Sequence, residues 1–327
     1  MKVAVLKGGS SLEREVSLRS AARVEDGLQE LGHEAVGIDV GRDLVSRLRS
    51  ERPDVVFIAL HGPGGEDGTV QELLEILDLP YTGPGVAACA LCMDKVASKH
   101  EIRAAALPTP DWAAFNATAF RELGAADTLD EIEYRLGFPL VIKPASQGSS
   151  LGVEFASNRG EVPEALVAAF SYDDRVLLER YVKGRELAVS VLDGEALPMV
   201  EAIPREEDFF NFEARYEIGR TEYVCPAELG EAETQRVQEL ATRTYETLGC
   251  TGFARVDLML GDDGPQVLEV NAIPGLTDTS LFPMAAEAAG MDFTRLVERI
   301  LASARERPAS AALMRGRSER SEERPVV

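Results

Sequence analysis

Strands and helices alternate in the hydrophobic pattern of the first 94 residues. Apolar runs have the length of buried strands, and segments with apolar residues three and four apart have the spacing of amphipathic helices. In chain order the pattern predicts a strand at Val3–Leu6, a helix at Ser17–Glu30, strands at Ala35–Val40 and Val55–Leu60, and a helix at Thr69–Leu77. This alternation is typical of a parallel α/β sheet covered by helices. Ligands of such sheets bind at the carboxyl ends of strands, where loops begin at Lys7 and His61.

Beyond residue 94 the pattern is mixed and predicts two α+β units. We expect a central unit at residues 95–182 and a C-terminal unit at 183–308. Their predicted elements are strands at 138–144, 176–182 and 187–192, a helix at Glu231–Leu248, a hairpin at 255–271 and a helix at Asp292–Arg305. From 309 to 327 the composition turns to Ser, Arg, Glu and Pro, which predicts a disordered tail.

The hairpin at 255–271 brings polar side chains together. Two apolar runs flank a Gly/Asp cluster, and a three-residue loop at 262–264 is a common connection for such runs. The pairs that this loop creates are Asp257 with Glu269 and Arg255 with Asn271. Because side chains alternate between faces along a strand, those four should share one face. The opposite face should carry Val256, Leu258, Leu268 and Val270.

Two carboxylates and an amide side by side form a hard oxygen site. Asp257, Glu269 and Asn271 offer the ligands that Mg²⁺ or Mn²⁺ prefers, and magnesium held in this way usually works with substrate phosphates. The alternative is the solvent face of an amphipathic hairpin. That reading fits less well, because like charges directly opposite destabilise a sheet and the following segment, 272–277, is apolar.

Composition excludes several classes of protein. The chain has 327 residues and a net charge of −22, which argues against a nucleic-acid partner because phosphate binding needs a basic surface. The sequence contains no run of about eighteen apolar residues, so we expect no membrane span. The N-terminus enters a strand at once without a signal-peptide pattern, so we expect a cytoplasmic protein. Cys89 and Cys92 have redox-motif spacing but lie in a small, apolar segment, where we expect buried hydrophobic thiols.

Two loops suggest contacts with charged ligand groups. Lys143 ends a buried strand beside the Gly/Ser loop 145–152, which suits phosphate neutralisation with a backbone cradle, although such loops are also plain hairpins. Glu13 stands near a helix N-terminus and could complement the helix dipole or capture an ammonium group. His61 likewise has a structural and a functional interpretation: it is either part of a turn or a contact to a ligand. Gly8-Gly9 lacks the spacing of a dinucleotide fingerprint, which argues against a dinucleotide-dependent oxidoreductase.

The motifs together resemble the ATP-grasp ligases, and most closely the D-alanine–D-alanine ligases. The resemblance covers residues 1 to about 305 and rests on order and spacing. The motifs are Glu13–Ser17, His61–Gly68, Met93–Lys95, Lys143–Gly152, Phe209–Tyr216 and Arg255–Leu281. It implies a three-domain ATP-grasp architecture and ligation of two D-alanines for peptidoglycan synthesis through an acyl phosphate. It also suggests a homodimer.

The resemblance implies a role for each site residue. Asp257, Glu269 and Asn271 would hold two Mg²⁺ or Mn²⁺ ions on ATP. The other ATP contacts would be Lys95, Lys143, Ser149, Glu179, Tyr181, Val182, Glu186 and Arg215. Amino-acid contacts would come from Glu13, His61, Arg255, Ser280 and Leu281, with Gly275 polarising the reacting carboxylate beside Arg255. Glu13, Ser149 and Tyr216 would form a latch, and Phe209–Val224 is the candidate lid.

The chain departs from the family pattern at five positions. Arg215 stands where lysine is usual, Phe210 and Phe212 replace tyrosines, Gln147 replaces a common glutamate, and Ala272 replaces Thr or Ser. No predicted metal ligand is lost, so catalysis is still expected. Two alternatives remain: a carboxylate–amine ligase for another amino-acid pair, and a nucleotide-binding protein without catalysis.

Overall fold

The N-terminal part of the chain forms a parallel sheet, as the hydrophobic pattern predicts. In this computed structural model, which describes residues 1–204 and 221–305, three strands pair in the order β2-β1-β3. Their bounds are β1 Lys2–Lys7, β2 Glu34–Asp39 and β3 Val55–Ile58. The helices of this part are α1 Arg14–Glu30, α2 Leu44–Glu51, α3 Thr69–Ile76 and α4 Val86–Met93. The interior of β1 and all of β3 are apolar and buried, which is usual for parallel strands covered by helices, whereas the outer strand β2 buries only Ile38.

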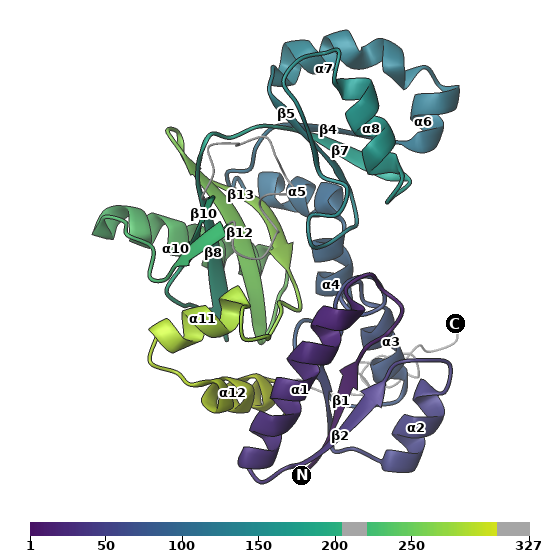
Figure 1. Ribbon diagram of the computed structural model, residues 1–327, viewed down its shortest axis with the longest axis vertical. Coiled ribbons are helices and arrows are strands. Elements are labelled where there is room, and N and C mark those ends of the chain that lie inside the picture. Colours follow the sequence, from purple (N-terminus) through teal and green to yellow (C-terminus); the bar gives the residue numbers. More distant parts are fainter. Residues whose placement is uncertain (205–220, 306–327) are drawn as a thin grey trace, which may run out of the picture.

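The central part forms a separate lobe around an antiparallel sheet, at the top of Figure 1. Its strands run in the order β4-β7-β5-β6, with bounds β4 Trp112–Asn116, β5 Leu140–Pro144, β6 Glu154–Ala156 and β7 Arg175–Arg180. The helices are α5 Lys95–Ala104, α6 Ala117–Glu122, the 3₁₀ turn η1 Ala125–Thr128, α7 Leu129–Leu136 and α8 Val162–Phe170. Asp94 is the N-cap of α5, because its carboxylate accepts hydrogen bonds from the amides of Val96 and Ala97.

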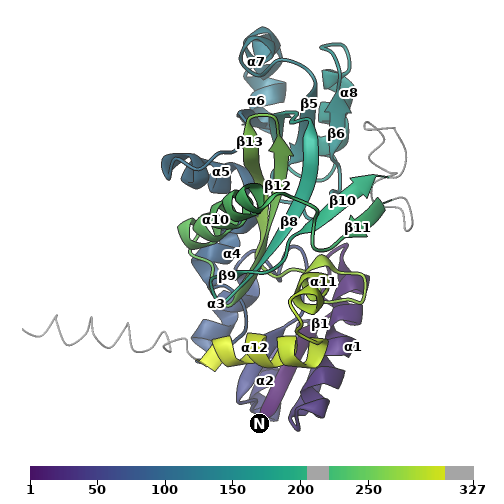
Figure 2. The same ribbon diagram turned by 90° about the vertical axis from the view of Figure 1, so that its left-hand side faces the viewer.

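The third sheet is antiparallel and holds the polar hairpin. Its order is β11-β10-β8-β12-β13, with the short β9 paired to β8. The bounds are β8 Gly184–Leu192, β9 Glu195–Ala196, β10 Val200–Pro204, β11 Thr221–Val224, β12 Phe253–Gly261 and β13 Gly264–Asn271. Helix α10 (Glu231–Thr247) lies across one face of this sheet in Figure 2, and α11 (Leu281–Ala288) and α12 (Phe293–Arg305) lead back to the first sheet. The predicted α/β fold with α+β units is confirmed.

The predicted pairing of the hairpin is confirmed, but the predicted turn is wrong. Asp257 lies opposite Glu269 and Arg255 opposite Asn271, although the loop has two residues, because Gly261 pairs with Gly264. A β-bulge at Leu268 restores the register: Leu258 pairs with Val267. A bulge sets two residues against one. Leu268, which was expected to face the core, therefore lies on the polar face of the hairpin, and Val267 faces the core in its place.

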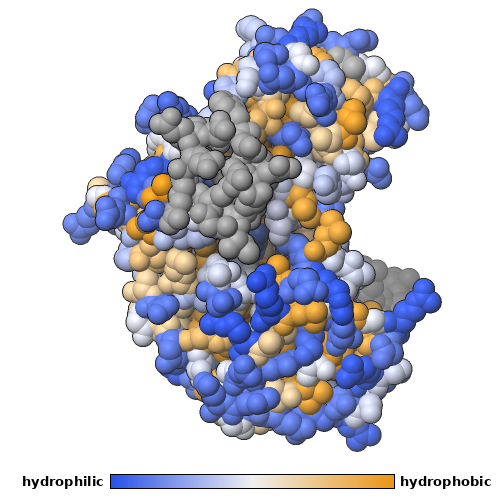
Figure 3. Space-filling view, in the orientation of Figure 1, coloured by the Kyte–Doolittle hydropathy of each residue, from blue (hydrophilic) through white to orange (hydrophobic). Residues whose placement is uncertain are grey.

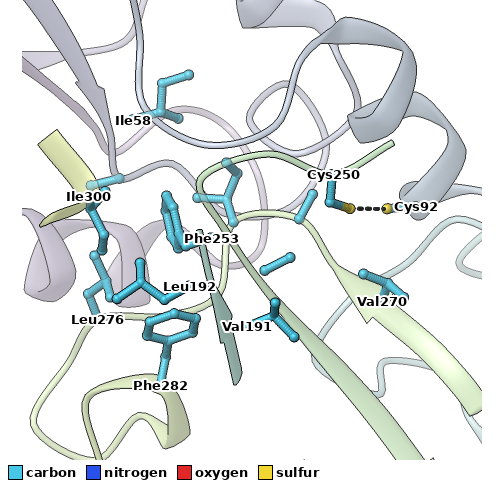
Figure 4. Packing of buried hydrophobic residues seen from close by; sticks show 14 of the residues in the cluster. Ile58, Cys92, Val191, Leu192, Cys250, Phe253, Val270, Leu276, Phe282 and Ile300 are labelled. Atoms are coloured by element: carbon cyan, nitrogen blue, oxygen red, sulfur yellow. Dashed lines mark hydrogen bonds between the residues drawn. The ribbon is translucent and has the colours of Figure 1, made fainter. Parts of the chain in front are cut away.

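One hydrophobic core joins the first and third sheets. Phe253 of β12 is completely buried and meets Phe282 of α11 edge to face, with 5.7 Å between ring centroids. Ile58 of β3 and Ile300 of α12 belong to the same cluster (Figure 4). The four-stranded lobe has its own core instead. The first and third sheets therefore form one packed body that carries the lobe.

The cysteines are free thiols, as the composition of their segment suggests. Cys89 and Cys92 are buried on α4. The Sγ atom of Cys92 lies 3.7 Å from Sγ of Cys250, a contact between distant segments that sequence spacing does not reveal (Figure 4). This hydrogen bond and burial raise the pKa of the Cys92 thiol well above its usual value. Among residues 1–204 and 221–305, none of the helices has both the length and the hydrophobicity to cross a membrane.

Candidate active site

Two cavities meet beneath the four-stranded lobe, and Figure 3 shows the surface hollowed between that lobe and the rest of the molecule. The first cavity has largely apolar walls and lies between β5, β7 and the hairpin β12–β13. The second is polar and faces the loops of the N-terminal sheet. Their shared lining consists of Ser150, Glu186, Asp257 and Glu269. Two of the predicted metal ligands, Asp257 and Glu269, therefore stand where the two cavities join, and the third, Asn271, lines the polar cavity.

The predicted metal ligands lie together on the hairpin. Nδ2 of Asn271 donates to Oδ2 of Asp257 at 2.9 Å, which leaves the amide oxygen of Asn271 facing outward from that bond. The guanidinium of Arg255 holds Asp257 through two bonds of 2.7 Å. Nζ of Lys95 lies 3.1 Å from Oε2 of Glu269. Burial raises the pKa of Glu269, but Lys95 and neighbouring cations more than offset this, so the net pKa is lowered and the group is ionised.

This oxygen-rich set fits a hard divalent cation. Asp257 and Glu269 are directly opposite each other, and such a pair is unfavourable in a sheet unless cations separate the charges. Arg255 and Lys95 supply that charge here. No cluster of three or more His, Cys, Asp or Glu suited to a metal occurs in the described part of the chain, so any ion would rely on Asn271 and on substrate oxygens as well.

The apolar cavity has a charged floor. Nζ of Lys143 donates to Oε2 of Glu179 at 2.7 Å, and both side chains are almost fully buried. The other oxygen of Glu179 pairs with the ammonium of Lys99, which has no exposed surface. Nζ of Lys99 also donates to Oγ1 of Thr109 at 2.5 Å. Burial lowers the pKa of Lys143, but nearby carboxylates, Glu179 first, more than offset this and raise it.

The walls of this cavity suit a flat aromatic ligand. Apolar surface is provided by Val141, Val153, Phe155, Met259 and Leu268. The cavity is also lined by Tyr181 and Val182, in the segment that leads from β7 to β8. The ring of Phe155 meets Tyr181 edge to face at 5.9 Å. Glu186, the remaining predicted nucleoside contact, lies at the junction of the cavities.

The loop at 145–152 is joined to the hairpin through Lys95, which contacts both Gln147 and Glu269. Nζ of Lys95 donates to the carbonyl of Gln147 at 2.6 Å, and the Gln147 amide donates to the carbonyl of Tyr172 at 3.0 Å. A glutamate, common here in the resembled family, could not donate that second bond when ionised. Ser149 and Ser150 both have positive φ, at 47° and 56°, a conformation that costs energy for residues with a side chain.

Glu13 connects this loop to the N-terminal sheet. Its Oε1 accepts a hydrogen bond from the hydroxyl of Ser149, so two residues of the predicted latch are in contact. Glu13 occupies the N-cap position of α1 but makes no side-chain capping bond there. Its other oxygen packs against backbone: a Cβ added at Gly62 or Gly148 would lie 2.6 or 2.9 Å from Oε2. Glycine at both positions lets the carboxylate enter the polar cavity.

His61 lies in the wall of the polar cavity, but protein atoms meet both of its ring nitrogens. Nδ1 is 3.0 Å from the carbonyl of Ile273 and 3.2 Å from Oε1 of Glu66, and Nε2 is 3.1 Å from Oγ of Ser20. Burial raises the pKa of Glu66. In this arrangement neither ring nitrogen of His61 is left for a substrate.

The far end of the polar cavity combines Arg255 with the loop that follows β13. Among the described residues, the N–H of Gly275 has no acceptor, whereas the amides of Leu276 and Thr277 donate to Ser20 and Ser280. A Cβ on Gly275 would lie 2.8 Å from Oγ of Ser280, so a side chain here would displace the Ser280 hydroxyl. Ser280 is the N-cap of α11, and Leu281 begins that helix, whose N-terminus favours an anion.

Some predicted residues cannot be placed in this arrangement. Arg215, Tyr216, Phe210 and Phe212 lie outside the residues that the structure describes, as does most of the candidate lid at 209–224. Only its last part is described, as β11, paired antiparallel with β10. Tyr223 of β11 lines the polar cavity. The roles of these residues stay predictions.

Comparison with known proteins decides the family. Residues 102–302 match the family model "D-ala D-ala ligase C-terminus", and residues 42–84 match "D-ala D-ala ligase N-terminus". The chain belongs to the D-alanine–D-alanine ligase family. The resemblance inferred from the ordered motifs is therefore confirmed.

Members of the D-alanine–D-alanine ligase family align along nearly the whole chain. The D-alanine–D-alanine ligase of Syntrophotalea carbinolica is 46% identical over 303 residues, covering 93% of this chain and 96% of the relative. The crystal structure of the Bacillus anthracis ligase superposes with a TM-score of 0.83 at 36% identity, covering 93% of this chain and 97% of that one. A Bacillus anthracis structure complexed with ATP gives a TM-score of 0.79 at 34% identity, with the same coverage of both chains.

In this member of the D-alanine–D-alanine ligase family, sequence reasoning missed three residues that contact predicted site residues and one that lines the apolar cavity. They are Ser20, Glu66, Lys99 and Leu268. Glu66 lies within the recognised motif 61–68, and Lys99 follows Lys95 by one helical turn, so helical spacing could have indicated it. Ser20 and Leu268 give no such signal, because one contacts a segment 256 residues away and the other depends on a bulge.

Proposed function

We infer that this protein joins two D-alanines into D-alanyl-D-alanine and converts ATP to ADP and phosphate. The dipeptide is the one built into peptidoglycan precursors. Family membership supports the reaction, and one observation carries it: Asp257 and Glu269 line both cavities, so one site can hold nucleotide phosphates on one side and an amino-acid carboxylate on the other. A carboxylate is a poor acyl donor, and transfer of the γ-phosphoryl group gives it a good leaving group.

On the nucleotide side, the proposed contacts come from the floor and walls of the apolar cavity. Lys143 and Lys95 would neutralise the phosphates beneath the loop that carries Ser149. Glu179, Tyr181, Val182 and Glu186 would bind the nucleoside part. Arg215, outside the described residues, is proposed as a further phosphate contact. The solved relative with ATP supports ATP as the co-substrate.

The hairpin would hold the metal ions. Asp257, Glu269 and Asn271 are proposed as the protein ligands of two Mg²⁺ or Mn²⁺ ions. When bound, such ions neutralise charge on the transferring phosphoryl group. The carboxylates are already fixed by Arg255 and Lys95, so little rearrangement of the backbone is needed to present them.

On the amino-acid side, the chain would orient two D-alanines and stabilise the tetrahedral intermediate. Glu13 would bind the ammonium group of the first D-alanine. Arg255 and the open N–H of Gly275 would polarise its carboxylate and then stabilise the oxyanion when the second amine attacks. Ser280 and Leu281, at the N-terminus of α11, would bind the carboxylate of the second D-alanine.

Three finer points complete the proposal. Tyr216 would join Glu13 and Ser149 in the latch, and the segment 209–224 would exclude water that destroys an acyl phosphate. We also propose a homodimer in the cytoplasm, because the resembled family suggests the dimer and the reaction uses ATP. No nucleic-acid partner or membrane is proposed, in keeping with the net charge of −22 and the absence of a long apolar run.

The reaction is tested by ADP and phosphate release with ATP and Mg²⁺, with mass identification of the product. D-Alanine should support release and give D-alanyl-D-alanine, whereas L-alanine and D-lactate should not. Release with D-serine and a mixed dipeptide would assign the second site to another amino-acid pair. Tight ATP binding without turnover on any amino acid would make the chain a nucleotide-binding protein and refute the proposal.

The metal assignment is tested with a matched pair of variants. Asp257→Asn should lower kcat by at least about 100-fold, since it removes a charged ligand from the phosphoryl-transfer site. Asp262→Asn removes the same charge from the exposed turn of the same hairpin and should leave kcat unchanged. Equal activity of both variants would exclude Asp257 as a ligand.

A further inference from the structure

Helix α1 holds the loop after β13 through both backbone groups of one residue. Oγ of Ser20 accepts a hydrogen bond from the amide of Leu276 at 3.1 Å, and Nη1 of Arg23 donates to the Leu276 carbonyl at 3.0 Å. Ser20 and Arg23 are three residues apart and share a face of the helix. The side chain of Leu276 is 1% exposed and packs in the common core beside Phe282 (Figure 4). Leu276 is thus fixed on three sides.

The hydrogen bonds around His61 favour one tautomer of its ring. The Ile273 carbonyl can only accept, so Nδ1 of His61, 3.0 Å away, must carry a hydrogen. Ser20 already accepts from Leu276, and within the described residues the recorded acceptor for its own hydroxyl hydrogen is Nε2 of His61, at 3.1 Å. A ring that carries its hydrogen on Nδ1 and accepts from Ser20 at Nε2 satisfies every one of these bonds. Carboxylate Oε1 of Glu66, 3.2 Å from Nδ1, agrees with a donor at that nitrogen.

These bonds enclose the segment that carries the open amide. His61 bonds the carbonyl of Ile273, and Ser20 bonds the amide of Leu276. Ser20 and His61 also bond each other, so the two contacts to the loop are linked. Gly275 lies between them and lines the polar cavity together with Arg255, and its N–H has no acceptor among the described residues. An oxyanion donor contributes fully only when it is held in place before the reaction, because reorganisation during catalysis costs energy.

We propose that Ser20 is a positioning residue for ligation, which fixes the Nδ1-protonated form of His61 and the amide of Leu276 together, so that loop 273–276 presents the N–H of Gly275 to the reacting carboxylate. The proposal rests on the ligase function above. It gives His61 the task of holding this loop, in place of a direct bond from a ring nitrogen to the substrate.

The kinetic test compares two buried serines of the same helix. Ser20→Ala should lower kcat about 10- to 100-fold, because a donor displaced by less than an ångström loses much of its effect, and should change KM for ATP less than twofold. Ser17→Ala is the control: Ser17 is equally buried and bonds Gly8 and Ala59, but does not touch loop 273–276. It should lose similar stability and keep kcat within about threefold.

The spectroscopic test does not depend on turnover. The chain has three histidines, so nitrogen-15 spectra of the imidazole rings can be assigned with His33→Gln and His100→Gln. The parent protein should show His61 protonated on Nδ1 and bare on Nε2, and Ser20→Ala should shift the Nε2 signal. A parent ring protonated on Nε2, or a Ser20→Ala variant with parental kcat, would overturn the proposal. A parent protein without D-alanine-dependent ADP release would refute the ligase function instead, whatever the ring shows.

Discussion

Lys99 carries a charge that the folded protein stabilises poorly. It is fully buried and shares Glu179 with Lys143. Burial, together with the positive charges of Lys143 and Arg103, outweighs the attraction of Glu179 and lowers the pKa of Lys99 from 10.5 to about 8. That fall corresponds to about 3 kcal/mol against the protonated form. The ammonium must therefore be kept for something other than stability.

Replacement of Lys99 by Met tests this reasoning. Glu179 keeps Lys143 as its partner, so no carboxylate is left uncompensated, and the usual penalty for breaking a buried pair does not apply. The variant loses the bond to Thr109, worth about 1–2 kcal/mol. We expect the free energy of unfolding of the ligand-free variant at pH 7 to exceed that of the parent by about 1–2 kcal/mol. Urea unfolding followed by circular dichroism measures this.

Nucleotide affinity should move in the opposite direction. The group of two lysines and one glutamate has a charge of about +1 at pH 7, and Lys99→Met makes it neutral. A unit charge roughly 10 Å from a phosphate contributes about 1.5 kcal/mol at an effective dielectric constant of about 20, or roughly tenfold in Kd. Calorimetry should show weaker ATP binding and unchanged adenosine binding. Lys183→Met, which removes an exposed charge near the same cavity, should have little effect.

The pH dependence gives a second check. Because the folded pKa of about 8 lies below the unfolded value of 10.5, the unfolded chain binds more protons between them, and stability from this group rises with pH across that window. The parent should therefore gain stability relative to Lys99→Met from pH 8 upward, while its advantage in ATP binding disappears. A variant that is less stable than the parent at pH 7, or that binds ATP like the parent, would refute the reasoning.

Three further substitutions have expected outcomes. Gly184→Ala would place a Cβ 2.1 Å from the carbonyl oxygen of Leu260, so β8 and β12 must separate. Thermal denaturation should show that the free energy of unfolding falls by at least about 2 kcal/mol. The control Gly230→Ala, at a position with open space around it, should show only a small change. Gln147→Glu removes the donor to Tyr172, and KM for ATP should rise about fivefold, with no rise if that bond is unimportant. Phe253→Ala should cost about 3–5 kcal/mol, and the first and third sheets should unfold in one transition; two separate transitions would contradict a common core.

Periodicity alone predicts the parallel sheet and the polar face of the hairpin. The pairing of Asp257 with Glu269 follows from two-residue alternation, which survives an error in the turn because a bulge compensates for it. The same reasoning misplaces Leu268, since no local pattern specifies a bulge. Contacts across distant segments, such as Cys92 with Cys250, depend on how the sheets pack and leave no spacing to read.

The charged floor of the apolar cavity shows a different limit. Lys99 looks like any lysine on an amphipathic helix, and only the approach of β7 turns it into a buried partner of Glu179. The motifs reveal Lys143 because it ends a strand beside a Gly/Ser loop. They do not reveal what neutralises it, because the sequence specifies neither the distance nor the solvent content between two elements.

The common core of the first and third sheets also determines how the enzyme can be observed at work. The polar cavity lies mostly within that single body, whereas the apolar cavity lies between it and the four-stranded lobe. The only tryptophan of the chain, Trp112, sits at the edge of the lobe against α5, with Arg103 3.9 Å from its ring centroid and His100 edge-on at 5.2 Å. Any rotation of the four-stranded sheet against α5 changes the surroundings of this indole. Trp112 is therefore a fluorophore at this joint, and we expect its emission to change when nucleotide binding moves the four-stranded sheet.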